Sequence, residues 1–470
     1  MNYLPNVKVT MSEYKTYPTY IDSKIQWLGE IPEHWKVLNG QFIFRVINER
    51  SKTGNELLLS VSEKKGVTPR SEANVTMFMA ESYKGYKLCK KGDLVINSLW
   101  AWSNGLGFSE YLGIVSTAYS VYRPDHEQYD YKFLNYLLKT QRYVGQYQIV
   151  SKGIWISRLQ LSDWSFLRIP IAFPQKSEQT AIANFLDRKT SEIACFIALK
   201  EKTIALLKER KTTIINKFVT KGLDETVQMK DSGIEWLGKI PTNWEVKRLR
   251  YLGKCQNGVS NGADYFGSGY PFVNYGDAYK NRVLPNDVSG LAKATKRDRE
   301  LYSVKCGDVF FTRTSETIEE IGFASTCVKT IDDASFSGFL IRFRPMKNCL
   351  DTSFSKYYFR SNLHRPYFTK EMNLVIRASL SQDLLKGLPV ILPSLSEQKL
   401  IGDYLDQQIA KLDLSIAQAE KEISLIKEYQ QNLISEAVTG KIDVRDEIIV
   451  DMPLNLAAEG EVAYKAITQR

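Results

Sequence analysis

The feature that most constrains this chain is a phrase that it contains twice. The first copy is DSKIQWLGEIPEHWKV at residues 22–37, and the second is DSGIEWLGKIPTNWEV at residues 231–246. A second pair follows in the same order, because KKGDLVINS at 90–98 returns as KCGDVFFTR at 305–313. Internal repetition of this kind decides the architecture before any other signal does.

The spacing between matching positions divides the chain into variable and constant blocks. Trp27 and Trp236 are 209 positions apart, whereas Glu178 and Glu397 are 219 positions apart. The difference of ten residues is absorbed before the two glutamates, so the blocks that precede them vary in length. Beyond the glutamates the two copies keep their register to the residue.

Each constant block predicts one long helix. The expected helices are Ser177–Thr220 and Ser396–Thr439, about 65 Å each at about 1.5 Å per residue. Ser177 and Ser396 are expected N-caps, and the glutamate after each serine suits the positive end of the helix dipole.

Apolar positions recur in phase in both predicted helices, spaced by three, four or seven residues. Such spacing is typical of a heptad seam, which faces a partner helix. The seam residues are Ile182, Leu186, Ile193, Ile197, Ile204, Leu207, Ile214, Phe218, Ile401, Leu405, Leu412, Ile416, Ile423, Ile426 and Leu433, and Ala437 completes the second copy. Their matched lengths predict that the two helices pair antiparallel within one chain. The alternative is that each helix packs on its own domain.

The variable blocks, at about 38–160 and 247–379, predict a mixed α/β domain that is present twice. The segments DLVINSLWAW and DVFFTRT are expected to be buried strands that open onto polar loops. The segments at 133–147 and 354–368 are each expected to be a helix.

Basic and polar side chains gather on the predicted turns of both variable blocks. Arginine, lysine, asparagine and glutamine contact base edges and phosphates, and the net charge of +10 agrees with an anionic partner. The candidate DNA-binding residues are Lys64, Lys65, Arg70, Trp100, Trp102, Asn104, Lys152, Arg158, Asn257, Asn261, Lys296, Arg297, Arg299, Arg313 and Arg377. The alternative for any one of them is an ordinary solvated turn.

No catalytic centre is predicted in this chain. The sequence has neither a G-x-x-x-x-G-K-[ST] phosphate loop nor the Asn/Asp-Pro-Pro-aromatic motif of adenine methyltransferases. Its three histidines and six cysteines lack metal-ligand spacing, so neither a metal nor a disulfide framework is expected. A reducing cytoplasm is the expected location, and no stretch approaches the roughly 18 apolar residues of a membrane-spanning helix.

The repeated phrases resemble a known family, the DNA-specificity subunits of type I restriction–modification enzymes. The resemblance runs from about Ile21 to Val444. It is carried by WLGEIPEHW with WLGKIPTNW, by IPIAFPQKSEQTAIANFLD with LPVILPSLSEQKLIGDYLD, and by the helices that follow. The loop NSLWAWSNGLGFSEYLGIVSTAYSVYRP at 97–124 also resembles the first variable domain of such subunits.

The resemblance implies a fold and a function. The implied fold is mixed α+β, with two similar target-recognition domains separated by two long antiparallel coiled-coil helices in a pseudo-two-fold repeat. Each domain would recognise one half of a bipartite double-stranded DNA site, and the helices would set the spacing and dock two methyltransferase subunits. These partners would bring S-adenosylmethionine, and motor–nuclease subunits would bring ATP and Mg. The family's base-reading residues vary with the target, so none is transferred by motif.

The predicted boundaries follow from the repeat. They are an N-terminal extension at 1–21, target-recognition domains at 22–174 and 225–393, long helices at 175–224 and 394–443, and a C-terminal tail at 444–470. The tryptophans of the repeated phrase, Trp27, Trp35, Trp236 and Trp244, are expected to be packing anchors. Two alternatives stay open: a coiled-coil scaffold that joins two protein-binding domains, and a nuclease or methyltransferase with a degenerate motif.

Overall fold

The structure is a computed structural model of the 470-residue chain. It describes residues 14–63, 65–72, 82–153, 155, 159–315, 320–371 and 378–447. Contacts divide the chain into two compact units, of which unit 1 is Met1–Leu199 with Glu422–Arg470 and unit 2 is Lys200–Lys421. Each unit therefore holds a globular part and one section of each long helix.

Unit 1 is built on a four-stranded antiparallel sheet with the order β4-β11-β8-β9. Four two-stranded antiparallel pairs accompany it: β1 with β2, β3 with β12, β5 with β6, and β7 with β10. The strands are β1 (Tyr20–Asp22), β2 (Glu30–Pro32), β3 (Lys36–Asn39), β4 (Phe44–Val46), β5 (Leu59–Ser62), β6 (Gly66–Pro69), β7 (Lys87–Cys89), β8 (Leu94–Asn97), β9 (Leu106–Phe108), β10 (Gly113–Val115), β11 (Tyr119–Pro124) and β12 (Pro170–Phe173).

Unit 2 has a four-stranded antiparallel sheet with the order β16-β23-β19-β21. Like unit 1 it has two edge pairs next to the helix, β13 with β14 and β15 with β25, but it adds a three-stranded sheet, β18-β17-β22, and the pair β20-β24. The strands are β13 (Met229–Asp231), β14 (Lys239–Pro241), β15 (Glu245–Arg248), β16 (Gly253–Asn257), β17 (Phe266–Val273), β18 (Leu291–Ala292), β19 (Val309–Thr312), β20 (Thr314–Ser315), β21 (Ala324–Thr326), β22 (Ser335–Phe336), β23 (Leu340–Pro345), β24 (Ala378–Ser379) and β25 (Pro389–Leu392).

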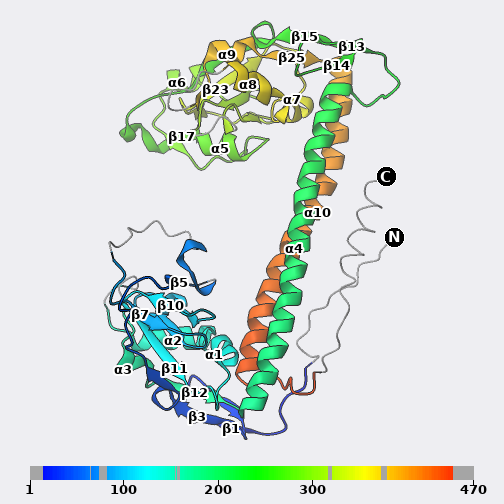
Figure 1. The fold of residues 1–470 in the computed structure, drawn as a ribbon. Coiled ribbons are helices and arrows are strands. Elements are labelled where there is room, and N and C mark those ends of the chain that lie inside the picture. The colour runs from blue at the N-terminus through cyan, green and yellow to red at the C-terminus, as the bar shows by residue number, and fades with distance from the viewer. Residues whose placement is uncertain are drawn as a thin grey trace. The chain divides into compact units, whose positions relative to one another are not determined.

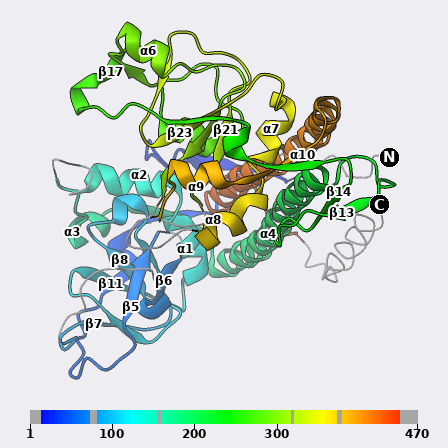
Figure 2. The same ribbon diagram turned by 90° about the horizontal axis from the view of Figure 1, so that it is seen from above.

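Short helices cover these sheets. In unit 1 they are α1 (Tyr131–Leu138), α2 (Gln141–Val150), α3 (Asp163–Phe166), η2 (Gly40–Phe42), η3 (Arg70–Glu72) and η4 (Ala101–Ser103). In unit 2 they are α5 (Tyr275–Lys280), α6 (Lys296–Leu301), α7 (Thr352–Tyr358), α8 (Arg365–Glu371), α9 (Gln382–Gly387), η6 (Leu249–Tyr251), η7 (Ala263–Tyr265) and η9 (Asn362–His364). Both views place α1 beside the first half of the long helix α4 (Lys176–Lys221), and α7 beside the first half of α10 (Leu395–Val438) (Figures 1 and 2).

Two expected helices are each broken in the structure. The segment 133–147 forms α1 and α2, because Thr140 takes an extended conformation (ψ 151°) and begins a new helix. The segment 354–368 is interrupted by Ser361, which is extended (ψ 158°), before α8 begins at Arg365. Pro366 lies in the first turn of α8, the place where a residue without an N–H is tolerated.

The long helices begin one residue earlier than expected, so Ser177 and Ser396 are not N-caps. The amide of Glu178 donates to the carbonyl of Gln175. In α10 the amide of Glu397 donates to the hydroxyl of Ser394, at 3.3 Å. The reason is geometric: strands β12 and β25 end immediately before the prolines, which leaves one residue for the cap.

Every seam residue is buried or partly buried. In unit 1, Ile182 and Leu186 share a hydrophobic cluster with Leu433 and with the last turn of α10. In unit 2, the end of α4 shares a cluster with Ile401 and with the turns that follow it. Ion pairs that join the helices in unit 2 include Lys211 Nζ to Asp413 Oδ1 at 2.5 Å and Lys208 to Glu420 at 3.7 Å.

The tryptophans of the repeated phrase pack as expected. Trp35 and Trp244 are buried in the cores of their units. Trp27 meets Tyr143 edge to face at 5.0 Å between ring centroids, and Trp236 packs near His364. Among the described residues, no helix is long and apolar enough to cross a membrane, and no group of three or more His, Cys, Asp or Glu side chains could hold a metal ion.

Candidate nucleic-acid interface

A glutamine at the start of each long helix fixes the globular part to it. The side-chain oxygen of Gln179 accepts from the backbone N–H of Asp130 at 2.9 Å, and its Nε2 donates to the carbonyl of Pro174 at 2.9 Å. Gln398 makes the same two contacts in unit 2, with Asp351 N–H at 2.8 Å and with Pro393 at 3.0 Å. Both glutamines are fully buried, so water cannot reach their amide groups and these contacts satisfy them instead.

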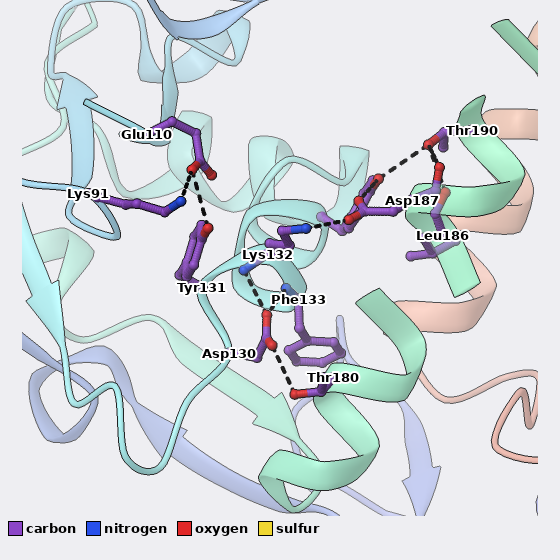
Figure 3. A network of polar contacts seen from close by, with 11 residues as sticks. Lys91, Glu110, Asp130, Tyr131, Lys132, Phe133, Thr180, Leu186, Asp187 and Thr190 are labelled. Atoms are coloured by element: carbon purple, nitrogen blue, oxygen red, sulfur yellow. Dashed lines mark hydrogen bonds and ion pairs between the residues drawn. The ribbon is translucent and has the colours of Figure 1, made fainter. Parts of the chain in front are cut away.

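An aspartate two turns further on makes a second anchor in unit 1. Asp187 accepts from Lys132 Nζ at 2.7 Å and from the Tyr136 hydroxyl at 2.8 Å. Figure 3 shows Lys132 reaching from α1 to Asp187 on α4, with Asp130 bonded to Thr180 below them. Burial is the main cause that raises the pKa of Tyr136 to about 12, so this phenol stays protonated and donates to the carboxylate.

The equivalent aspartate of unit 2 makes the same anchor. Asp406 accepts from Lys356 Nζ at 2.8 Å and from the Tyr357 hydroxyl at 2.7 Å. Burial, followed by this hydrogen bond, raises the pKa of Tyr357 above its usual range. A pair of charge-assisted hydrogen bonds thus holds the head of each unit to the helix at the same helical position.

The Gly-Asp phrases hold the strands that carry the polar loops. In unit 1, Asp93 is wholly buried and accepts two hydrogen bonds from Arg123, at 2.7 and 2.8 Å. In unit 2, Asp308 accepts from Arg344 at 2.6 and 2.5 Å. Because β8 and β19 start next to these pairs, the direction in which each strand leaves the core is fixed.

The loop after β8 forms a tight turn that presents two tryptophans. The rings of Trp100 and Trp102 stack with centroids 5.7 Å apart and an interplanar angle of 21°. Trp102 Nε1 donates to the carbonyl of Leu99 at 2.8 Å, and Asn104 closes the turn in the left-handed region with φ 61°. Gly105 follows so closely that a side chain there would meet the Trp100 carbonyl.

Lys152 lies beside this turn. Gln148 of α2 donates to the carbonyl of Trp102 at 3.1 Å, and Lys152 pairs in a β-bridge with Gln160. The amide of Leu161 then donates to the carbonyl of Ser98 at 2.9 Å. The structure therefore brings together four of the sequence-predicted residues, which are Trp100, Trp102, Asn104 and Lys152.

The β5–β6 hairpin carries Lys65, which is exposed, and Arg70, which is partly buried. Next to this hairpin lies Lys139, a residue that the sequence analysis missed. A Cβ on Gly66 would lie 3.6 Å from Lys139 Nζ, and burial lowers the pKa of this lysine. No sequence signal distinguishes Lys139, because it occupies the break between α1 and α2, which was expected to be continuous helix.

In unit 2 a second group of candidates meets at the ends of β16 and β19. Asn257 ends β16, and the following Val259 pairs with Ser337. Arg313 directly follows β19, and its Nη1 donates to the carbonyl of Gly338 at 3.4 Å. Asn257 and Arg313 thus both lie next to the 337–339 turn, whereas the exposed Asn261 is four residues further along the chain from Asn257.

The helix α6 presents Lys296 and Arg297 to solvent. Arg299 differs from them, because its guanidinium stacks on Tyr270 at 3.8 Å and pairs with Asp333. A side chain held in this way positions the β17 hairpin before it meets any ligand. Arg299 is therefore less available to a ligand than Lys296 and Arg297.

Three candidates, Lys64, Arg158 and Arg377, lie outside the described residues. DNA contact by the other twelve stays a prediction. Besides Lys139, sequence reasoning missed the anchors, which are Gln179, Asp187 and their counterparts in unit 2. A signal for both existed, because Gln179 and Asp187 recur at offset 219 as Gln398 and Asp406.

The comparisons with known proteins agree with this architecture. Residues 241–425 match the family model described as the type I restriction modification DNA specificity domain. The chain is similar to the type I restriction enzyme EcoKI specificity subunit of Escherichia coli K12, with 23% identity over 66% of this chain and 65% of that protein. It is also similar to the MjaVIII specificity subunit of Methanocaldococcus jannaschii, with 24% identity over 88% of this chain and 95% of that protein. The first match thus spans slightly less than two thirds of the relative.

Two solved structures share the fold. One is a chain solved in work on complex assembly and conformational transition of the type I R-M system, with a TM-score of 0.67 and 15% identity over 88% of this chain and 99% of that one. The other is the HsdS subunit of Thermoanaerobacter tengcongensis, with a TM-score of 0.51 and 17% identity over 88% and 98%.

The class defined by these matches is that of proteins with a type I DNA specificity domain. The chain is similar to specificity subunits of type I restriction enzymes, and this similarity confirms the resemblance stated from its repeated phrases.

Proposed function

We propose that the globular part of each unit recognises one half of a bipartite double-stranded DNA target. The helices α4 and α10 then form an antiparallel coiled coil that sets the spacing between the half-sites and docks two methyltransferase subunits. The chain itself carries no chemistry. Methyl transfer from S-adenosylmethionine belongs to the methyltransferase partners, and ATP and Mg belong to motor–nuclease subunits.

The observation that carries this proposal is the duplicated anchor. A buried glutamine and an aspartate hold each head to its helix with the same atoms and within about 0.1 Å of the same distances. The loops that these heads present share no sequence, as a pair of modules with different DNA targets requires. A constant mount with a variable surface is what a subunit needs when only the recognised bases change.

The coiled-coil part of the proposal rests on contacts inside each unit. The start of α4 packs on the end of α10 in unit 1, and the end of α4 packs on the start of α10 in unit 2. Both contacts have the sense of an antiparallel pair. Apolar side chains outside the seam, such as Leu400, Leu414 and Leu425, are exposed and offer surface to partner subunits.

A loop exchange tests the recognition proposal. In the chain assembled with its methyltransferase partner, residues 253–345 are replaced by the corresponding segment of a relative with a different target. Sequencing of methylated adenines should reveal a new base sequence in one half of the site and the original sequence in the other. A change in both halves, or in neither, would refute the assignment of one half-site to each unit.

An insertion tests the spacing proposal. Seven residues added to both long helices preserve the seam and lengthen the pair by roughly 10 Å. Because base pairs are stacked about 3.4 Å apart, the spacer between half-sites should widen by about 3 base pairs. A control that inserts seven residues after Val444 should leave the spacer unchanged. An unaltered spacer in the helix variant would refute the spacing role.

A further inference from the structure

Three of the eight tryptophans are more than half exposed, and all three belong to unit 1. Trp100 is 55% exposed, Trp155 is 69% exposed and Trp164 is 65% exposed. Trp164 is covered on one face by the guanidinium of Arg168, 3.9 Å from its ring centroid. Trp100 differs, because its stacking partner is another tryptophan on the same turn. The stacked pair Trp100–Trp102 is thus an aromatic surface with one ring more than half exposed, which is open to a ligand.

The turn that carries Trp100 is held rigidly. The backbone N–H of Trp100 donates to the carbonyl of Asn97 at 2.9 Å. The carbonyl of Trp100 accepts from the amides of Ser103 at 3.0 Å and Gly105 at 2.8 Å. Ala101, the next residue, is wholly buried. An aromatic ring on so constrained a turn loses little conformational entropy when it binds a flat ligand.

Charge identifies the kind of ligand. The described residues that meet here, 97–105, 148–153 and 159–161, contain no aspartate or glutamate, and they include Lys152. The nearest acid in sequence, Asp163, already accepts from Ser120 at 2.5 Å and from Tyr122 at 2.7 Å. An aromatic turn whose contacting segments carry a lysine and no acid suits a base and its flanking phosphates better than an acidic protein surface.

We propose that Trp100 stacks on a base of the half-site that unit 1 recognises, entering the duplex at a base step that is thereby unstacked. Trp102 supports the ring from behind, and Lys152 neutralises the adjacent phosphate. Apolar side chains that enter a duplex in this way kink it and open the stack. This inference rests on the proposed function, and it adds a distortion of the DNA to the recognition of its bases.

The test uses the full chain with its methyltransferase partner and a library of random-sequence duplexes, from which the wild-type complex selects its target. The selected duplex is then made with 2-aminopurine at successive positions of each half-site. Wild type should raise the fluorescence of the probe at one step of a single half-site, because the probe brightens when it is unstacked. Trp100→Ala should abolish this signal and weaken binding about 5- to 150-fold.

Two further variants separate stacking from charge and from loss of fold. Trp100→Phe keeps a flat ring and should retain most of the affinity and the signal. Tyr251→Ala removes an equally exposed aromatic from η6 of unit 2 and should change neither. The slope of log affinity against log salt should be the same for Trp100→Ala as for wild type, since no phosphate contact is lost, whereas Lys152→Ala should reduce it by about one.

Each other outcome overturns the proposal in a recognisable way. If Trp100→Ala binds the selected duplex as wild type does, the stacking role is refuted while the proposed function stands. If the variant binds DNA normally but no longer retains the methyltransferase partner, the tryptophan surface is a protein contact instead. If the wild-type complex selects no duplex, the proposed function and this inference fail together.

Discussion

The two units differ most where the repeated phrase meets the start of a long helix. In unit 1 the carboxylate of Glu178 is buried and accepts three hydrogen bonds, from the Tyr17 hydroxyl at 2.8 Å, His34 Nε2 at 2.8 Å and Trp35 Nε1 at 3.0 Å. Arg445 lies on the same side, with its guanidinium 5.0 Å from the Tyr17 ring centroid.

In unit 2 the equivalent carboxylate is almost unused. Glu397 is partly exposed and accepts only a 3.5 Å contact from Asn243 among the contacts of the described residues. Trp244 is fully buried, yet its Nε1 has no hydrogen-bond partner within the part of the chain that the structure describes. The position that corresponds to Tyr17 at offset 209 is Thr226, whose hydroxyl donates to Asp224 at 2.6 Å.

The difference shows that two similar copies of the repeated phrase can be attached to their long helices in two ways. In unit 1 the segments before and after the repeat, around Tyr17 and Arg445, complete the polar cluster. In unit 2 one continuous stretch follows α4, and the cluster is left incomplete. The buried Gly-Asp and glutamine anchors make the same contacts in both units. The contacts around these anchors differ between the units.

The largest expected effect concerns the buried aspartate–arginine pair, which is the same in both units. Arg123→Ala leaves the buried Asp93 carboxylate without its partner and should lower the free energy of unfolding of unit 1 by about 4 kcal/mol. Arg344→Ala should do the same to unit 2 through Asp308. Hydrogen exchange of the amides in each unit measures both effects. A large loss in one unit and none in the other would break the equivalence.

The second largest expected effect concerns the glutamate at the start of each long helix, where the two units differ. Glu178→Ala removes three hydrogen bonds and leaves the indole N–H of Trp35 buried and unpaired, so unit 1 should lose about 3 kcal/mol. Glu397→Ala is the matched control and should cost less than about 0.5 kcal/mol. Denaturant unfolding followed by tryptophan fluorescence compares the two. Equal losses would contradict the asymmetry.

Acidic pH should destabilise unit 2 more than unit 1. Burial, together with the charge of Arg365, lowers the pKa of His364 in unit 2 from 6.5 to about 3. The unfolded chain binds a proton near pH 6.5 and the folded unit does not, so this contribution to stability is complete above pH 6.5 and is lost as the pH falls toward about 3. At pH 5 the loss should be roughly 2 kcal/mol.

The matched variant for this prediction is His364→Phe, which keeps an aromatic ring near Trp236 and removes the titration. The difference in unfolding free energy between pH 7.5 and pH 5, followed by hydrogen exchange of unit 2, should shrink by the same amount. His34 and His126 of unit 1 are exposed, so no comparable buried histidine acts there among the described residues. An unchanged pH dependence in the variant would exclude His364 as its source.

The smallest effect concerns the second anchor. Asp187→Asn and Asp406→Asn keep an acceptor but remove the charge that Lys132 and Lys356 meet. Because both aspartates are partly exposed, each change should cost only about 1 kcal/mol. The two losses should agree, and thermal unfolding of the two variants measures them. A difference larger than the effect itself would show that the heads are mounted differently.

Much of the architecture was predictable from the sequence. The repeat located both long helices to within one residue at each end, because heptad spacing over more than forty residues leaves no other regular structure. The strands after the Gly-Asp turns were also predicted. The breaks at Thr140 and Ser361 were not, because both lie inside apolar patterns that continue across the break.

The candidate interface was predicted only as a set of residue types. Sequence located Trp100 and Lys152 on turns, but their meeting depends on hydrogen bonds from Gln148 and Leu161, which lie far along the chain. It also grouped Arg299 with Arg297, whereas the stacking on Tyr270 separates them.

The sequence by itself determined that this chain is a duplicated unit with two long amphipathic helices, since periodicity and repetition are properties of order along the chain. The tertiary structure decided which copy of a residue makes hydrogen bonds. Glu178 accepts three and Glu397 accepts one long contact, although each follows a serine in the first turn of a long helix. The physical reason is that a hydrogen bond depends on what is brought within about 3 Å, and for these carboxylates the partners come from segments outside the repeat.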